Sequence, residues 1–267
     1  MAERAEWIPS DVDPSVPSAA RIYDALLGGE HNFAVDREFA QQAQQVFPGV
    51  AESCRANRSF LARLVRHLVE HGVRQFLDIG SGIPTSGNVH EVAQRFDPTC
   101  RVVYVDNEPV AVAHSEMLLQ GNANAKILRA DMRDPDAILR SAIVRDMLDF
   151  DQPIAVFMLA LLHFIPDGDD PAGLVARYRE ALPPGSYLAI SHATAESRPD
   201  EMRALVRLYA SSSNPAVARS NQWITDLFGD FALAHPGTVY TPQWRPGPDV
   251  TLADPEQYIF FGGLARK

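Results

Sequence analysis

The stretch "FLDIGSGIPTSGNV", residues 76–89, decides the fold, because it places an apolar run directly before a glycine turn. In an open α/β sheet such a turn lies at the carboxyl end of a strand, where ligands bind. The dinucleotide pattern G-x-G-x-x-G requires a third glycine at position 85, and the chain has Thr85 there. We therefore expect a strand, a ligand-binding turn and a helix, with a ligand other than a dinucleotide.

Short β-rich apolar runs alternate with helical stretches from Gly72 onward. Strands are predicted at 74–79, 101–106, 125–131, 153–162 and 185–191, and helices at 84–96, 108–120, 135–148 and 171–182. This alternation is typical of parallel strands joined by crossover helices, and predicts a doubly wound α/β sheet. Helices at 200–211 and 216–228 and strands at 231–240 and 257–266 complete the chain.

The first quarter of the chain is helical in its pattern. Residues 1–17 carry three prolines and several acids, which favour an extended lead-in. Apolar spacing predicts helices over 18–27, 36–47 and 52–71, and Gly28-Gly29 ends the first of them. We predict that 1–72 form a helical arm, or lid, packed on the domain formed by 73–267.

Composition sets limits on the kind of protein. With 46% hydrophobic and 22% charged residues in 267, the chain is an ordinary globular protein with one main domain. The formal charge of -10 argues against nucleic acid as a partner. Cys54 and Cys100 form no CxxC pair, so we expect no disulfide framework and no metal site. No signal peptide or membrane-length apolar run is present, and we expect a cytoplasmic protein.

Three aspartates follow or end successive predicted strands: Asp78, Asp106 and Asp131. Asp106 could accept hydrogen bonds from both hydroxyls of a ribose, and Asp131 from an adenine amino group, with Met132 against the ring. One such aspartate alone is more often a helix N-cap, but three in succession favour a binding site. Asp78 is also the acid two residues before the first glycine, and this arrangement of three aspartates suits S-adenosylmethionine. A nicotinamide oxidoreductase is disfavoured by Thr85 and by Asp131.

The stretches "LDIGSG", "YVDNEP", "RADMRD", "IAVFMLALLHFIPD" and "LPPGSYLAISH" resemble class I S-adenosylmethionine-dependent methyltransferases over roughly 73–267. More narrowly, "PSAARIYDALLGGEHNFAVDRE" is similar to the N-terminal signature of an actinobacterial methyltransferase-like family, long labelled a domain of unknown function (DUF574-type). The resemblance implies a Rossmann-like seven-stranded sheet with one antiparallel strand, "QYIFFGGLAR", and S-adenosylmethionine as the ligand.

The cofactor site is expected to combine strand ends with the arm. In the arm, Arg21, Tyr23 and Asn32 could lie over the methionine part or the acceptor and exclude water. A purely structural role, in which the same groups cap helices and pair with surface acids, is the alternative. The predicted cofactor-binding residues are Asp78, Gly80, Ser81, Gly82, Asp106, Asn107, Asp131, Met132, Leu159, Arg21, Tyr23 and Asn32.

A base for the acceptor is less evident than the cofactor site. His163, after the fourth strand in "LALLHFIPD", is the first candidate for catalysis, and His192 in "AISHA" is the second. The family stretch "LHH" has a second histidine where this chain has Phe164, which argues against direct base catalysis. The late aromatic residues Tyr209, Trp223 and Phe228 are expected to be core side chains rather than a substrate cover.

Two functions of different kinds therefore remain open from the sequence. The first is methyl transfer from S-adenosylmethionine to a small-molecule acceptor through an oxygen or nitrogen nucleophile. The second is a non-catalytic S-adenosylmethionine-binding or regulatory module, which the apolar end of the fourth strand favours. The sequence does not identify the acceptor or the oligomeric state.

Overall fold

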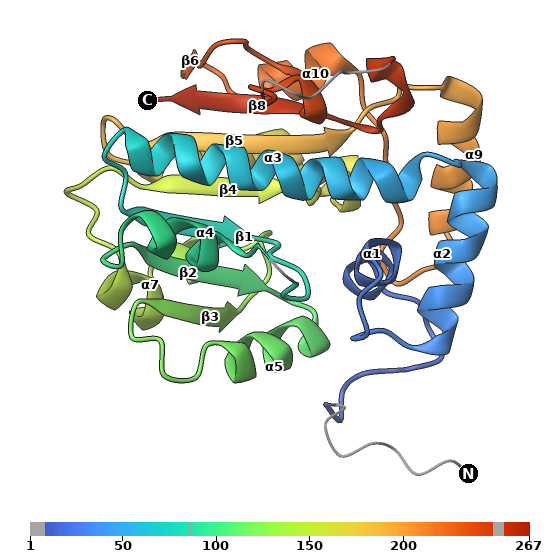
Figure 1. Cartoon of the computed structure of the whole chain (residues 1–267), viewed down its shortest axis with the longest axis horizontal. Coiled ribbons are helices and arrows are strands. Elements are labelled where there is room, and N and C mark those ends of the chain that lie inside the picture. The colour runs from blue at the N-terminus through green and yellow to red at the C-terminus, as the bar shows by residue number, and fades with distance from the viewer. Residues whose placement is uncertain (1–8, 86, 248–253) are drawn as a thin grey trace.

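The computed structural model describes residues 9–85, 87–247 and 254–267. In these residues an eight-stranded sheet forms the centre of the molecule, and helices cover both of its faces (Figure 1). The strands are β1 (Gln75–Ile79), β2 (Arg101–Asp106), β3 (Ala125–Arg129), β4 (Ala155–Leu159), β5 (Tyr187–Ala193), β6 (Ala232–Leu233), β7 (Val239–Tyr240) and β8 (Phe260–Arg266). Their order is β3-β2-β1-β4-β5-β8-β6, and β7 also pairs with β8.

The strand directions confirm the predicted Rossmann-like sheet. The strands β1 to β5 are parallel, and β8 is antiparallel to β5, as expected for "QYIFFGGLAR". The predicted strand 231–240 is interrupted, because β6 and β7 pair with β8 separately and residues 234–238 lie between them. Pro236 in this interruption has no N–H to donate to a neighbouring strand. The sheet therefore has eight short strands where the sequence predicts seven.

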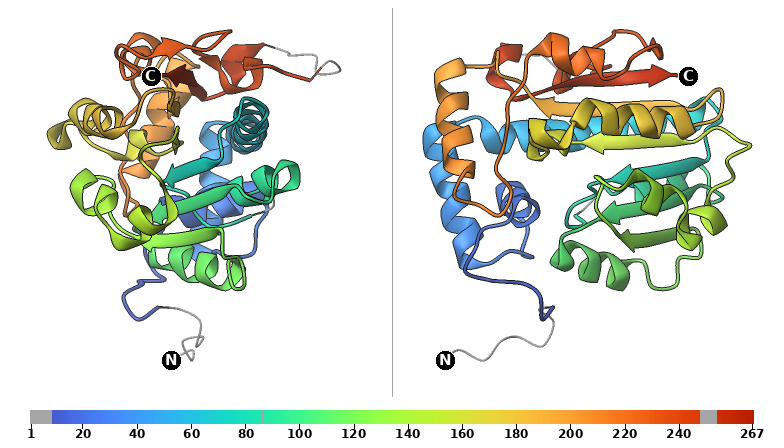
Figure 2. Two further views of the ribbon diagram at one scale, coloured as in Figure 1. Left: turned by 90° about the vertical axis from the view of Figure 1, so that its left-hand side faces the viewer. Right: turned by 180° about the vertical axis from the view of Figure 1, so that it is seen from behind.

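Helices lie on both faces of the sheet (Figure 2). Successive side chains along a strand point to opposite faces, and both faces of this sheet are apolar. In β1, Leu77 and Ile79 pack on one face, whereas Phe76 packs on the other. The helices of the first face are α6 (Pro135–Leu139), α7 (Ala142–Met147), α8 (Pro171–Ala181) and α10 (Asn221–Asp226). Those of the second are α3 (Val50–Glu70), α4 (Val89–Phe96) and α5 (Pro109–Leu118).

The first two helices, α1 (Ala19–Leu27) and α2 (Ala34–Val46), lie beyond the carboxyl ends of the strands (Figure 1). They share an apolar core with the start of α3 and with α9 (Pro199–Tyr209), in which Ile22, Phe39 and Leu205 are buried. The rest of α3 packs on the sheet, so this helix joins the arm to the domain. The division of the chain at residue 72 stays a prediction.

Several predicted boundaries are wrong by a few residues. The helix predicted over 84–96 begins at Val89, because Glu91 accepts hydrogen bonds from the N–H groups of Gly87 (2.7 Å) and Asn88 (3.1 Å) and so caps it there. The helix predicted over 135–148 is divided into α6 and α7, since Ser141 caps the second.

The ends of the two central strands also differ from the prediction, and they matter for the site. The strand β4 ends at Leu159 rather than at residue 162, and Leu162–Phe164 form a short 3₁₀ helix. The strand β5 runs two residues further than predicted and contains His192. His192 is therefore a sheet residue, and His163 is separated from the end of its strand.

Candidate functional site

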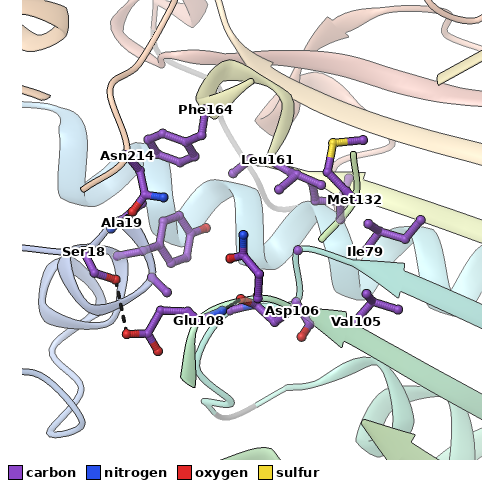
Figure 3. A pocket seen from close by; sticks show the side chains of 18 of the residues that line it. Ser18, Ala19, Ile79, Val105, Asp106, Glu108, Met132, Leu161, Phe164 and Asn214 are labelled. Carbon is purple, nitrogen blue, oxygen red and sulfur yellow. Dashed lines mark hydrogen bonds between the residues drawn. The ribbon is translucent and has the colours of Figure 1, made fainter. Parts of the chain in front are cut away.

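A cavity of about 390 Å³ lies at the carboxyl ends of β1 to β4, facing α1. Its size is within the range of small-molecule sites. The lining from the strand ends includes Asp78, Gly80, Ser81, Gly82, Asp106, Asn107, Asp131, Met132 and Leu159. Figure 3 shows Asp106 and Met132 on this side of the cavity, with Phe164 and Asn214 on the other. The fold thus brings the predicted strand-end residues together in one place.

The glycine turn needs its glycines for both conformation and space. Gly80 and Gly82 have φ angles of 71° and 67°, in the left-handed region. A Cβ atom on Gly80 would lie 2.5 Å from a methyl carbon of Leu161. The N–H of Gly80 donates to the carbonyl of Val105 (2.8 Å), and that of Gly82 to the carboxylate of Asp106 (2.7 Å). The turn is therefore bent tightly around the end of β2.

Asp78 is buried at the end of β1. Burial raises the pKa of its carboxyl to about 7; Arg58 opposes this rise and Asp106 adds to it. Arg58 comes from α3 and donates to the carbonyl of Gly87 (3.2 Å) and the side chain of Asn88 (3.3 Å). The Nε–H of Arg58 is buried without a hydrogen-bond partner. An unpartnered buried donor beside a buried acid is costly unless a ligand completes the site.

The other two aspartates are held in different ways. Asp106 is buried, which raises its pKa, and its carboxylate also accepts from the N–H of Glu108 (2.9 Å). Asp131 pairs with Arg133 at 2.5 Å and accepts from the amide of Asn107 (3.3 Å). The hydrogen bond from Arg133 is the main cause of the lowered pKa of Asp131. Each oxygen of Asp106 accepts one hydrogen bond and keeps a free lone pair, because a carboxylate oxygen can accept two. Both oxygens of Asp131 are already occupied, by Arg133 and Asn107.

Of the predicted arm residues, Tyr23 lines the cavity. Its hydroxyl donates to the carbonyl of Cys54 (3.1 Å) and accepts from the amide of Asn57 (3.2 Å). The amide oxygen of Asn57 in turn accepts from the hydroxyl of Ser191 on β5 (2.7 Å). This chain of hydrogen bonds ties α1 to α3 and to the sheet. Burial raises the pKa of Tyr23, so its phenol stays protonated.

Arg21 and Asn32 do not line the cavity, and for them the structural alternative holds. Arg21 is buried between Asp36 and Glu108, at 2.8 Å from each carboxylate. Asn32 is buried and donates to Asp24 at 2.7 Å. A buried cation needs paired acids around it, which explains why these polar groups cluster in the arm without reaching the cavity.

His163 also lies outside the cavity. It lines a separate pocket of about 40 Å³ behind Phe164, and its ring packs 4.3 Å from that of Phe164 and 5.9 Å from that of Phe260. Burial lowers the pKa of His163 well below its usual value, helped by His192 and Arg219. The structure therefore places the predicted base away from the strand-end residues.

His192 has both ring nitrogens engaged. Nδ1 donates to the carbonyl of Ala193 (2.8 Å), since a carbonyl can only accept, and Nε2 accepts from Arg219 (3.0 Å). Burial lowers its pKa to about 3. Arg219 also binds Asp167 (2.7 Å) and the carbonyl of Ile165 (2.7 Å), so it holds the segment after β4 against β5. His192 serves this clamp rather than the cavity.

The sequence predicts that the three late aromatic residues are core side chains. Tyr209 and Phe228 are buried, and Trp223 is partly buried against the core. Tyr209 is buried against Phe39 in the core of the arm, with ring centroids 5.0 Å apart. Phe228 is buried in the core of the first sheet face. Trp223 lies 4.3 Å from the guanidinium of Arg219, which packs over its ring. None of these three described residues lines the cavity.

Several cavity residues escape the sequence analysis, among them the polar residues Asn57, Arg58, Glu108 and Asn214. Glu108 has a signal, because an acid directly before Pro109 is typical of a helix N-cap, and it does cap α5. Asn57 and Arg58 are ordinary polar residues of a long helix, and Asn214 lies in a serine-rich turn. Nothing local distinguishes these three, because the other walls of the cavity come from distant segments.

No group of histidine, cysteine and acidic side chains within the described ranges could hold a metal ion. Cys54 and Cys100 are both free and buried. In the part of the chain that the structure describes, no helix is long and apolar enough to cross a membrane.

The family model described as S-adenosyl methyltransferase matches residues 5–267. The chain belongs to the S-adenosyl methyltransferase family. A DUF574 family protein from Streptomyces avermitilis MA-4680 is 40% identical, with a TM-score of 0.91 over 96% of this chain and 99% of that one. A Thermobifida fusca YX protein assigned as a methyltransferase is 41% identical, with a TM-score of 0.92 over 98% and 99%. No curated protein matches the chain.

A more distant solved structure, that of a methyltransferase, has the same fold. Mitomycin 7-O-methyltransferase MmcR is 18% identical, with a TM-score of 0.52 over 98% of this chain and 74% of that one. With the family match, the chain is a methyltransferase and its cofactor is S-adenosylmethionine, not a nicotinamide.

Proposed function

We propose that this methyltransferase methylates a small-molecule acceptor at an oxygen or nitrogen atom, with the cofactor along the carboxyl ends of β1 to β3. A cavity of about 390 Å³ supports a small acceptor. The net charge of -10 argues against a nucleic-acid acceptor. The side chains at the ends of β3, β2 and β1 would bind, in this order, the adenine, the ribose and the methionine part of the cofactor.

The fit of the cofactor follows the order β3-β2-β1. Met132, after β3, would lie against the adenine ring, and Asp131 would accept from its amino group in place of the amide of Asn107, which donates to it at 3.3 Å. Asp106, at the end of β2, would accept from the ribose hydroxyls. Asp78, at β1, would bind the ammonium group of the methionine part. Leu159, at the end of β4, would bound the site on its apolar side.

The observation that carries this fit is the pair Asp78 and Arg58. Both side chains belong to the described part of the chain, both line the cavity, and they form no ion pair with each other. Asp78 is a buried acid with a raised pKa, and Arg58 has a buried Nε–H without a partner. An amino acid part offers an ammonium group for the first and a carboxylate for the second.

S-adenosylmethionine supplies a methyl group on a cationic sulfur that is a good leaving group. The chain then has to align the acceptor with that methyl group and exclude water. Tyr23 on α1 and Leu161 after β4 both line the cavity and would form its cover, and Leu161 lies against Gly80 of the glycine turn. The hydrogen bonds of Tyr23 to Cys54 and Asn57 hold this cover in place.

Calorimetric titration with S-adenosylhomocysteine, followed by an assay of its production from S-adenosylmethionine with panels of small phenols, amines and heterocycles, tests the proposal. We expect binding, and turnover with at least one small acceptor. Binding without turnover across the panels would support the non-catalytic module instead. Absence of binding would contradict both.

A further inference from the structure

The cavity has a second half that the proposed cofactor does not use. In the sheet, β4 lies next to β1 on the side away from β2. With the methionine part at β1, the space beside β4 faces the reacting methyl group. This space is bounded by α1, by the segment after β4 and by residues 213–217, which come from three distant parts of the chain. We call it the acceptor chamber.

The side chains of the acceptor chamber carry no formal charge. They include Tyr23, Leu27, Leu161, Phe164, Asn214 and Val217. Glu108, an acid of the cavity lining at the start of α5, is already paired with Arg21 of α1 (2.8 Å) and accepts from the N–H of Ala111 (2.8 Å). Its charge is therefore compensated within the chain, and the chamber offers no counter-ion to a charged acceptor.

Two polar residues, Ser213 and Asn214, line this wall, and the hydroxyl of Ser213 is already engaged with the carbonyl of Pro17 and the side chain of Asn214. The amide oxygen of Asn214 accepts from the N–H of Ala19 (3.1 Å) and from the hydroxyl of Ser213 (2.8 Å). Only the oxygen can accept from an N–H, so the orientation of the amide is fixed. Figure 3 shows Asn214 beside Phe164, with its amide nitrogen on the side of the cavity. The side chain thus caps α1 with its oxygen and offers N–H donors to a ligand.

We propose that the acceptor chamber binds an uncharged, mainly apolar molecule, and that Asn214 donates a hydrogen bond to a lone pair of that molecule. An ionised group in this chamber would lose its hydration without gaining a partner, which costs several kcal/mol. A neutral ring system with a carbonyl or similar acceptor satisfies both the apolar walls and the Asn214 donors. This inference rests on the proposed function, because it places the acceptor beside the cofactor.

The reaction balances without a basic side chain in the chamber. A lone pair on the acceptor forms the new bond to the methyl carbon, and the carbon–sulfur bond breaks with its electron pair left on sulfur. The proton that the acceptor loses passes to water, because the hydroxyl of Tyr23 is protonated and already donates to the carbonyl of Cys54. The chain therefore selects nucleophiles that react in their neutral form.

Three indoles of similar size and different charge test the inference: indole-3-carboxaldehyde, indole-3-carboxylate and tryptamine. Each is titrated by ligand-observed NMR into the full chain saturated with S-adenosylhomocysteine. The variant Asn214→Asp keeps an oxygen to cap Ala19 but replaces the donor by a negative charge. The control is Asn124→Asp, which adds the same charge directly before β3. This position lies at the amino ends of the parallel strands and outside the cavity lining.

We expect the neutral aldehyde to bind at least tenfold more tightly than either charged indole. Asn214→Asp should weaken the aldehyde about tenfold, whereas Asn124→Asp should have no effect. Three results would overturn the inference. They are tighter binding of a charged indole, no binding of any of the three indoles, and an aldehyde affinity that Asn214→Asp leaves unchanged. These results differ from a failure of the proposed function, which would appear first as no binding of S-adenosylhomocysteine.

Discussion

The two halves of the cavity are built in different ways. The half at the ends of β1 to β3 comes from short runs in which each side chain follows its strand directly, such as Asp78 and Gly80. The acceptor chamber is assembled from α1, the segment after β4 and residues 213–217. Its walls are tied by long-range contacts, such as Asn214 to Ala19. The residues of the first half are those proposed to bind the cofactor, and the residues of the second half are those proposed to select the acceptor.

This comparison predicts that changes at the strand ends act on cofactor binding, whereas changes behind the chamber do not. The largest effect is expected at the glycine turn. Gly80→Val would place a branched side chain at a φ of 71° and against Leu161. We expect cofactor affinity to fall more than 100-fold, a loss of about 3 kcal/mol, because the new side chain displaces Leu161 and the turn on which the cofactor would lie.

Gly121→Val is the matched control for this substitution. Gly121 has a φ of 82°, but a Cβ atom there would meet open space, far from the cavity lining. It should lower thermal stability in a similar way and leave the affinity for S-adenosylhomocysteine unchanged in calorimetry. Equal affinities for both variants would show that the glycine turn is not the binding site.

Asp106→Ala should have the next largest effect. It removes the carboxylate proposed to accept from the ribose, so the affinity for S-adenosylhomocysteine should fall by roughly 1.5 to 3 kcal/mol. Asp134→Ala removes another aspartate that accepts a backbone N–H, at the start of α6, and is the control. A loss of the same size in both variants would point to a helix-capping effect rather than to a ribose contact.

The pH dependence of binding tests Asp78. Its pKa is raised to about 7, so the free protein carries a neutral carboxyl below that pH and a carboxylate above it. The ammonium group of the cofactor favours the ionised form, so affinity should rise about eightfold from pH 6.0 to 7.5. Calorimetry of the wild type and of Asp78→Asn measures this. A pH profile that is the same in both would remove Asp78 from the site.

The smallest effect is expected at His163. Its ring is buried behind Phe164 and outside the cavity, and its pKa is lowered well below the usual value. His163→Gln should keep the affinity for S-adenosylhomocysteine within twofold and leave the pH profile of methyl transfer unchanged. A 100-fold slower transfer with normal binding would instead restore His163 as the base.

The sequence predicts those parts of the structure that depend on short-range patterns. The parallel sheet, its antiparallel β8 and the strand-end aspartates follow from apolar runs and the residues after them. The assignments of Arg21 and Asn32 fail because a polar residue in an arm can equally pair with a buried acid, as Arg21 does with Asp36. Asn214 leaves no local signal, since its role depends on the distant α1.

A crystal structure of the protein with S-adenosylhomocysteine tests the central claim most directly. Our account predicts the ribose hydroxyls at hydrogen-bond distance from Asp106, and the amino acid part between Asp78 and Arg58, with the acceptor chamber open beside the sulfur. A ligand whose amino acid part lies against Asn214 and Phe164 instead, or a cavity that excludes the ligand, would contradict it.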